Sequence, residues 1–258
     1  MLTNYNNYDE FINLMTDSFA KSDNRLNNLR EVFNIFVQVR NIMRYSDNLN
    51  DCYKIKNIKF LTANNLFLIH ELLVNIVLKN YISVFSLIRI LIENMYTMTF
   101  LKNTSNMINE IYSDYNDLCT FNIWNDEKIE KYEKKYSVTI KKNKSKQWID
   151  QIKGKSNYNG FSYIIHEVNS LKKEFYSNWY SWHSYFIHSS ISATRLNISL
   201  FLDDNDNYVQ FKNDFLDFIV CDLHRLYEIN EDYLDISLEQ KRETIEAINE
   251  FYEKYTKK

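Results

Sequence analysis

The stretch LFLIHELLVNIVLKNYISVFSLIRILIENMYTMTFL, residues 66–101, is the most apolar part of the chain and decides its fold. Ionisable side chains interrupt it, so it falls short of an uncharged membrane span. These side chains are His70, Glu71, Lys79, Arg89 and Glu93. We therefore expect the most buried region of the protein here, formed by one or two long helices from about residue 59 to residue 101, with a turn near Asn80.

The composition favours an all-α protein. The chain has 258 residues, of which 45% are hydrophobic and 25% charged, as is typical of an ordered globular protein. It has no Pro and only two Gly, whereas β-hairpins need such residues at their tight turns. We predict a compact multi-helix bundle in one domain, residues 1–258. Asn can replace Gly at turns, so a small β-hairpin near residues 195–211 stays open beside a helix.

Helical periodicity and capping residues place further helices along the chain. Thr104 or Ser105 can cap the helix that begins in NTSNMINEI, and Ser237 with Gln240 has the pattern of a capping box. The predicted segments are residues 8–21, 23–45, 103–112, a long helix from about residue 161 or 170 to residue 188, 211–233 and a C-terminal helix within 237–258.

The sequence indicates neither a bound metal nor a cofactor. The three cysteines, Cys52, Cys119 and Cys221, form no C-x-x-C pair, which argues against a zinc site and a disulfide framework. There is no H-E-x-x-H motif, and two glycines cannot build a phosphate-binding loop. The N-terminal residues lack the order of a secretory signal. We expect a cytoplasmic protein with no membrane contact.

Charge is unevenly distributed, although the net charge is only -3. Residues 128–155 hold ten lysines against three acidic residues, and residues 203–235 hold ten acidic residues against two basic ones. These segments are either two solvated faces or surfaces that attract one another within or between chains. The overall charge predicts no general attraction to nucleic acid.

One polar cluster can be predicted from helical spacing. Arg89 and Glu93 lie one turn apart among apolar residues, and a buried unpaired charge is costly, so each needs a partner. The order Arg before Glu is the weaker one for a pair within a helix, which favours partners from another helix. In WYSWHSYFIHSS, residues 179–190, Tyr180, Ser184 and His188 share one helix face, and His183 lies on another.

SLIRILIE followed by WYSWHSYFIHSS resembles a widespread prokaryotic helical family that pairs an R-x-x-x-E helix with a later Y-x-x-x-S-x-x-x-H helix. The resemblance spans residues 59–192, the predicted core. It implies that the recurring polar positions of the family correspond to Arg89, Glu93, Ser184 and His188, with Tyr180 beside them.

The family is similar in outline to HEPN helical-bundle proteins, many of which are ribonucleases of toxin and antiphage systems. The resemblance implies metal-independent RNA cleavage or binding, with His188 moving the 2′-hydroxyl proton and Arg89 stabilising charge on the phosphate. This chain departs from the HEPN spacing of Arg and His, because the position five residues before His188 is His183. A nuclease would need Arg89 to act from a different helix, or His183 to replace the Arg. Lysines of the basic segment would guide the RNA: Lys141, Lys142, Lys144 and Lys146.

Three alternatives stand beside this interpretation. Buried networks of Arg, Glu and His also occur purely as structure. A non-catalytic sensor or scaffold that binds a protein partner or its own copy would fit the same helices. A nucleophilic pair of Ser184 and His188 has the reach for covalent catalysis but lacks a strained nucleophile turn and recognisable oxyanion donors.

Overall fold

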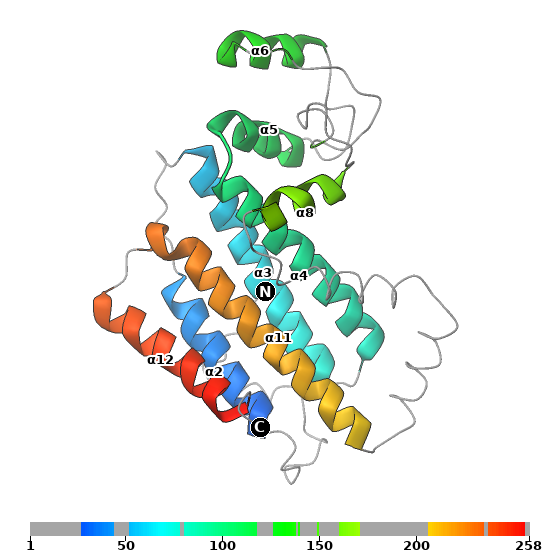
Figure 1. Cartoon of the computed structure of the whole chain (residues 1–258), viewed down its shortest axis with the longest axis vertical. Coiled ribbons are helices and arrows are strands. Elements are labelled where there is room, and N and C mark those ends of the chain that lie inside the picture. Colours follow the sequence, from blue (N-terminus) through cyan, green and yellow to red (C-terminus); the bar gives the residue numbers. More distant parts are fainter. Residues whose placement is uncertain are drawn as a thin grey trace. The chain divides into compact units, whose positions relative to one another are not determined.

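The computed structural model of this chain describes residues 27–43, 52–77, 80–117, 126–137, 139, 149, 160–170, 206–234 and 237–255. Over these residues the fold is all-α, with eight α-helices, one short 3-10 helix and no strand (Figure 1). The prediction of an all-α bundle is confirmed. The elements in chain order are α2 (Asn27–Ile42), α3 (Tyr53–Val77), α4 (Tyr81–Lys102), α5 (Asn106–Asp117), α6 (Asp126–Tyr136), α8 (Phe161–Ser170), α11 (Asp206–Asn230), η3 (Glu231–Tyr233) and α12 (Leu238–Tyr255).

The long apolar stretch folds as two helices with a turn at Asn80, as predicted. The Asn80 backbone N–H donates to the Asn75 carbonyl at 2.9 Å, and the Asn80 carbonyl accepts from Val84 N–H at 3.1 Å. The Asn80 side chain also donates to Ser83 Oγ at 2.8 Å. Asn80 therefore satisfies backbone groups on both sides of the turn. The first of the two helices, α3, begins at Tyr53, six residues earlier than predicted.

Among the described helices, the segment Ile82–Lys102 is long and apolar enough to cross a membrane by length and composition. Within the protein, 61% of its apolar window is buried. A helix in the core of a globular protein has the same length and apolar composition. Its fully buried residues include Val84, Ile88, Leu91, Ile92 and Met95.

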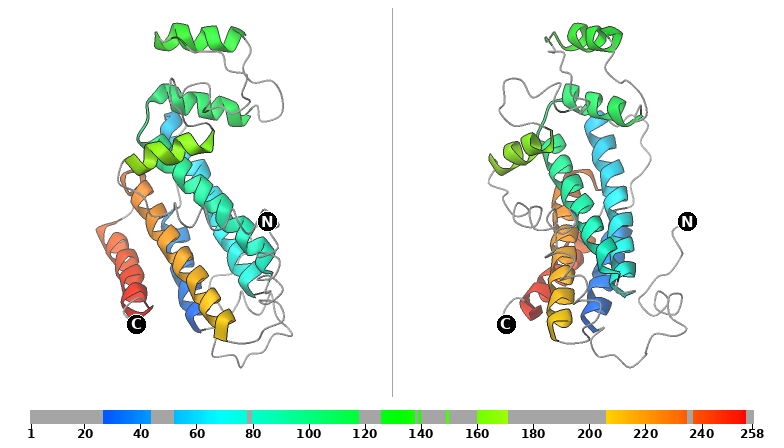
Figure 2. Two further views of the ribbon diagram at one scale, coloured as in Figure 1. Left: turned by 45° about the vertical axis from the view of Figure 1, so that its right-hand side comes forward. Right: turned by 90° about the vertical axis from the view of Figure 1, so that its right-hand side faces the viewer.

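The chain divides into two compact units that interleave along the sequence. The first comprises Met1–Ser46, Leu66–Ile88 and Tyr185–Lys258. Here α2 lies beside both α11 and α12 (Figures 1 and 2). The Phe85 ring meets the Phe215 ring edge-on, with 5.6 Å between centroids. The prediction of a single domain stays a prediction.

The last helix of the first unit begins with the predicted capping box. The Ser237 backbone N–H donates to Gln240 Oε1 at 3.1 Å, and the Gln240 backbone N–H donates to Ser237 Oγ at 3.2 Å. Two N–H groups that a helix start leaves without a partner inside the helix are thus satisfied reciprocally. The capping-box prediction is confirmed.

Residues 195–211, for which a β-hairpin or a helix was possible, are helical where the structure describes them. α11 begins at Asp206, so residues 206–211 belong to a helix and form no strand. The earlier part, residues 195–205, lies outside the described residues. The inward face of α11 carries a dense apolar row, which suits a helix that is packed on several sides: Phe215, Phe218, Ile219, Leu223 and Leu226.

The second unit comprises Asp47–Asn65 and Arg89–Ser184. In it, the first half of α3 lies against the second half of α4, where Asn94 Nδ2 donates to the buried Asn65 Oδ1 at 2.8 Å. α8 packs on α4 as well, because the Tyr96 ring meets the Phe161 ring at 90° and the Tyr96 hydroxyl donates to Asn169 Oδ1 at 3.2 Å. Of the predicted helix 161–188, residues 161–170 form α8, and the remainder lies outside the described residues.

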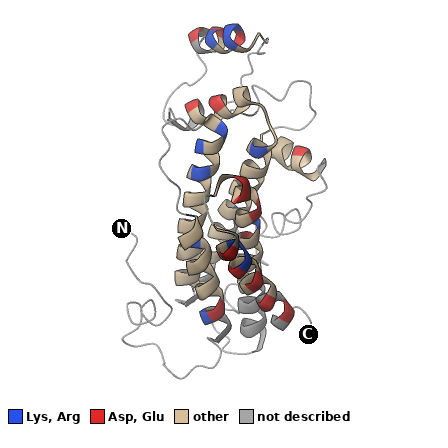
Figure 3. Cartoon of the chain, turned by 90° about the vertical axis from the view of Figure 1, so that its left-hand side faces the viewer, with Lys and Arg blue, Asp and Glu red and all other residues tan. Residues whose placement is uncertain are grey.

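Within the second unit, α6 and the first half of α3 differ in their distribution of charged residues (Figure 3). α6 mixes lysines and glutamates, with Lys131, Lys134 and Lys135 exposed. The first half of α3, residues 53–65, carries Lys54, Lys56 and Lys59 and no acidic residue. Of the ten lysines in residues 128–155, the described residues include those of α6, and the others lie outside the described residues.

Candidate functional site

Arg89 and Glu93 pair with each other on α4. Arg89 Nε donates to Glu93 Oε1 at 3.0 Å, and the two side chains are 25% and 36% exposed. The two charges thus form an ion pair within the helix, at a partly exposed surface, although the order Arg before Glu is the weaker one. At a partly exposed surface such a pair has a smaller desolvation cost than it would have in a sealed core. Partners from another helix stay a prediction.

The remaining residues of the predicted cluster lie outside the described residues, as do the predicted nucleic-acid lysines. The structure thus gives the position of Arg89 and Glu93 alone. The others are Tyr180, His183, Ser184, His188, Lys141, Lys142, Lys144 and Lys146. The cluster stays a prediction.

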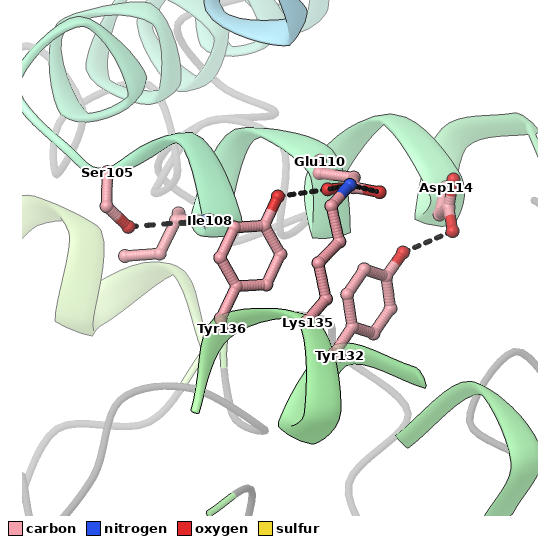
Figure 4. Close-up of polar contacts among 7 residues, drawn as sticks. All are labelled: Ser105, Ile108, Glu110, Asp114, Tyr132, Lys135 and Tyr136. Carbon is pink, nitrogen blue, oxygen red and sulfur yellow. Dashed lines mark hydrogen bonds and ion pairs between the residues drawn. The ribbon is translucent and has the colours of Figure 1, made fainter. Parts of the chain in front are cut away.

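A second polar cluster, on α5 and α6, was not predicted (Figure 4). Its centre is Glu110 on α5, which is 2% exposed. Lys135 Nζ on α6 donates to both Glu110 carboxylate oxygens, at 2.8 and 2.6 Å, and the Tyr136 hydroxyl donates to Oε2. A buried carboxylate is tolerated when it is paired and hydrogen-bonded, and Glu110 has both kinds of partner.

One turn later on α5 and one turn earlier on α6, the Tyr132 hydroxyl donates to the Asp114 carboxylate. Tyr132 is itself almost fully buried, so its ring supplies the apolar contact between α5 and α6 and its hydroxyl supplies the polar one. In Figure 4 the side chains of Tyr132, Lys135 and Tyr136 all point from α6 toward α5. We call these five residues the α5–α6 clasp: Glu110, Asp114, Tyr132, Lys135 and Tyr136.

The clasp shifts the pKa values of its donors upward. The hydrogen bond to Glu110 is the main cause that raises the pKa of Lys135. Burial, followed by the bond to Glu110, raises the pKa of Tyr136, and burial with the bond to Asp114 raises that of Tyr132. Each donor therefore keeps its proton more strongly in the folded chain than in water.

Behind the clasp, a buried amide network joins α5 to α3. Asn57 Nδ2 donates to the Asn109 carbonyl at 2.8 Å, and Asn57 Oδ1 accepts from the Ser113 hydroxyl at 2.6 Å. Asn109 in turn donates to the Leu101 carbonyl at 3.0 Å, at the end of α4. The start of α5 is capped by Ser105, whose Oγ accepts from Ile108 N–H at 3.5 Å. These bonds fix α5 as the platform on which α6 lies.

The clasp leaves a weak trace in the sequence. Tyr132 and Tyr136 are spaced four apart and flank Lys135, so one face of a short helix carries two aromatic donors and a cation. This spacing does not identify Glu110 as the partner of Lys135. Glu110 lies 25 residues away, and in the sequence it resembles any polar residue of an amphipathic helix. Each of the five clasp residues forms a hydrogen bond with another member of the clasp. This arrangement is typical of a structural contact between two helices.

No protein-family model, curated protein or solved structure matches this chain. The resemblance to the R-x-x-x-E family and to HEPN proteins therefore stays a prediction that rests on short motifs. Among the described residues, no group of three or more His, Cys, Asp or Glu side chains is placed to hold a metal ion.

Proposed function

We propose that the protein acts on RNA, by metal-independent cleavage or binding, at a site that contains Arg89, Glu93, Ser184 and His188. The observation that supports this function is the position of Arg89: its side chain is 25% exposed and is held by Glu93 at 3.0 Å. A guanidinium has five N–H donors in a planar fork and can bond to a carboxylate and a phosphate at once. The resemblance to HEPN proteins supports a role in a toxin or antiphage-defence system.

In the proposed reaction, His188 removes the proton of a ribose 2′-hydroxyl, and the 2′-oxygen attacks the adjacent phosphorus. The bond from phosphorus to the 5′-oxygen breaks, that oxygen takes up a proton from water, and protonated His188 releases its proton to water. The products are a 2′,3′-cyclic phosphate and a 5′-hydroxyl. Arg89 stabilises the charge that develops on the phosphate, and Glu93 holds its guanidinium in place.

The test is incubation of the purified protein with a mixed RNA pool, with and without EDTA. We expect cleavage that EDTA leaves unchanged and that Arg89→Ala and His188→Ala abolish. His183→Ala is the control and should retain activity. The Arg89–Glu93 pair is partly exposed, and near the surface an ion pair is worth about 1 kcal/mol or less. We therefore expect Arg89→Ala to fold, and a circular dichroism melt of this variant checks that its effect can be assigned to function.

Cleavage that persists in both Arg89→Ala and His188→Ala would show that the reaction does not take place at this site. Loss of cleavage in His183→Ala together with an unaffected Arg89→Ala would instead place the cation at His183. An absence of RNA cleavage and binding in the parent protein would contradict the function itself.

A second function, a non-catalytic scaffold that binds a protein partner or its own copy, is favoured by exposed apolar residues on α4. Ile82 is 67% exposed and Ile90 43% exposed, and they lie eight residues, just over two turns, apart. Exposed apolar side chains offer apolar contact area to a partner. Sedimentation velocity of the parent and of Ile82→Ser tests this function, which requires a larger species that the substitution dissociates.

A further inference from the structure

The first half of α3 combines exposed aromatic rings with lysines. Tyr53 is 40% exposed and Phe60 63% exposed, although large aromatic side chains normally lie in the core. Lys56 is exposed between them, and the spacing 53, 56, 60 follows one face of a helix. Lys59 is half-buried at the edge of this face. We call Tyr53, Lys56, Lys59 and Phe60 the α3 face.

Further lysines lie near the start of this face. Lys54 Nζ donates to the Lys102 carbonyl at 3.1 Å, so the end of α4, which carries Lys102, lies beside the start of α3. Lys135 Nζ lies 6.0 Å from the centroid of the Tyr53 ring and binds Glu110 at the same time. Residues 53–65 of α3 contribute three positive charges and no negative one.

We propose that the α3 face binds single-stranded RNA, with Tyr53 and Phe60 stacking on bases and Lys56 and Lys59 contacting phosphates. This combination of a cationic track and accessible rings is the chemistry of sequence-tolerant single-strand binding, since every base offers a flat face and every nucleotide a charge. The inference rests on the proposed action on RNA and adds a binding surface separate from Arg89 and Glu93.

Charge decides between RNA and a second copy of the chain as the occupant of this face. Two copies joined through equivalent α3 faces would bring the lysines of one copy against those of the other, which disfavours the contact. An RNA strand has one phosphate per nucleotide and gains from the same lysines by releasing its counterions. The α3 face therefore complements an anionic partner.

The test is fluorescence anisotropy with a labelled, mixed-sequence 2′-O-methyl oligonucleotide of about 15 nucleotides, a length that spans the usual single-strand sites. The 2′-O-methyl group blocks attack by the 2′-oxygen, so binding is measured without cleavage. Phe60→Leu keeps apolar volume but removes the ring, and we expect it to weaken binding roughly five- to a hundredfold.

The charge of the α3 face is tested by Lys56→Gln, with Lys241→Gln on α12 as a control of equal net charge. We expect Lys56→Gln to weaken binding and to lower the slope of log affinity against log salt by about 0.7. Lys241→Gln should leave both the affinity and the slope unchanged. Thermal melts of all variants confirm that each is folded.

The outcomes separate this inference from the proposed function. RNA bound equally by the parent, Phe60→Leu and Lys56→Gln, but weakly by Arg89→Ala, would overturn the α3 face and leave the function in place. No binding by the folded parent would overturn both. A dimer that Phe60→Glu dissociates, with no RNA bound by the parent, would reassign the face to contact between copies.

Discussion

The Glu110 carboxylate, which is 2% exposed, lies 2.6 Å from Nζ of Lys135, whose side chain is 47% exposed. The two partners of this ion pair are thus unequally buried. Loss of the lysine would leave a buried negative charge without its cation, whereas loss of the carboxylate would leave a lysine that water can solvate. The pair should respond asymmetrically to substitution.

We expect Lys135→Met to lower the melting temperature more than Glu110→Gln does. Met keeps the aliphatic stem of Lys135 but removes the cation, and Gln keeps the shape of Glu110 without its charge. Circular dichroism melts of the two variants and of the double variant measure the difference. The double variant should be more stable than Lys135→Met alone, and equal losses in the two single variants would contradict the asymmetry.

The clasp should also make stability fall at alkaline pH. Lys135 and Tyr136 have pKa values raised above 10.5 and 10.0, respectively, because the fold favours their protonated forms. Their stabilisation is complete below the unfolded pKa values and is lost as pH rises through the higher folded ones. Urea titrations between pH 9 and pH 11 should show this loss in the parent.

A variant that carries both Lys135→Met and Tyr136→Phe provides the comparison for the alkaline titration. Its unfolding free energy should be lower at pH 9 and should change less between pH 9 and pH 11. A parallel decline of the two proteins would show that other groups cause the alkaline loss.

Asn57 should contribute more to stability than its polar side chain suggests. Asn57→Leu would remove the donor to the Asn109 carbonyl and the acceptor for Ser113, so the unfolding free energy should fall by about 1–3 kcal/mol. Asn103, an exposed asparagine at the end of α4, offers a matched control, and Asn103→Ala should cost less. Chemical denaturation gives both values, and a larger cost for Asn103→Ala would be inconsistent with the network.

The capping box of α12 should be worth about 1 kcal/mol, the usual cost of replacing a capping Ser by Ala. Ser237→Ala removes the Oγ that accepts from Gln240 N–H, and Ser237→Thr retains a hydroxyl. The midpoint of urea denaturation should therefore drop for Ala and change little for Thr. A lower midpoint for Thr than for Ala would mean that the hydroxyl is not the stabilising group.

The helices that could be predicted from the sequence are those whose signals are local. The apolar density of α3 and α4, the Asn80 turn and the Ser237 box all depend on residues within a few positions of one another. Chain-wide composition sufficed for the all-α class, because a chain with no Pro and two Gly has few residues suited to tight β-turns.

The contacts that could not be predicted depend on packing between distant segments. Glu110 has no sequence feature that marks it as buried, since its burial follows from where α6 lies on α5. For Arg89 and Glu93, the spacing of one helical turn was evident from the sequence. Whether the pair faces the core or water depends on the neighbours of α4. Exposure of Phe60 is likewise a property of the packed helices.

The clasp also gives two neighbouring lysines different chemical reactivities. Only the neutral amine of a lysine reacts with acylating reagents. Lys135 keeps its proton tightly, because it donates to both Glu110 oxygens. Lys134, the preceding residue, is exposed on the same short helix. Limited acetylation followed by peptide mass spectrometry should therefore modify Lys134 first, so the labelling ratio of two adjacent residues reports, in solution, whether α6 is seated on α5.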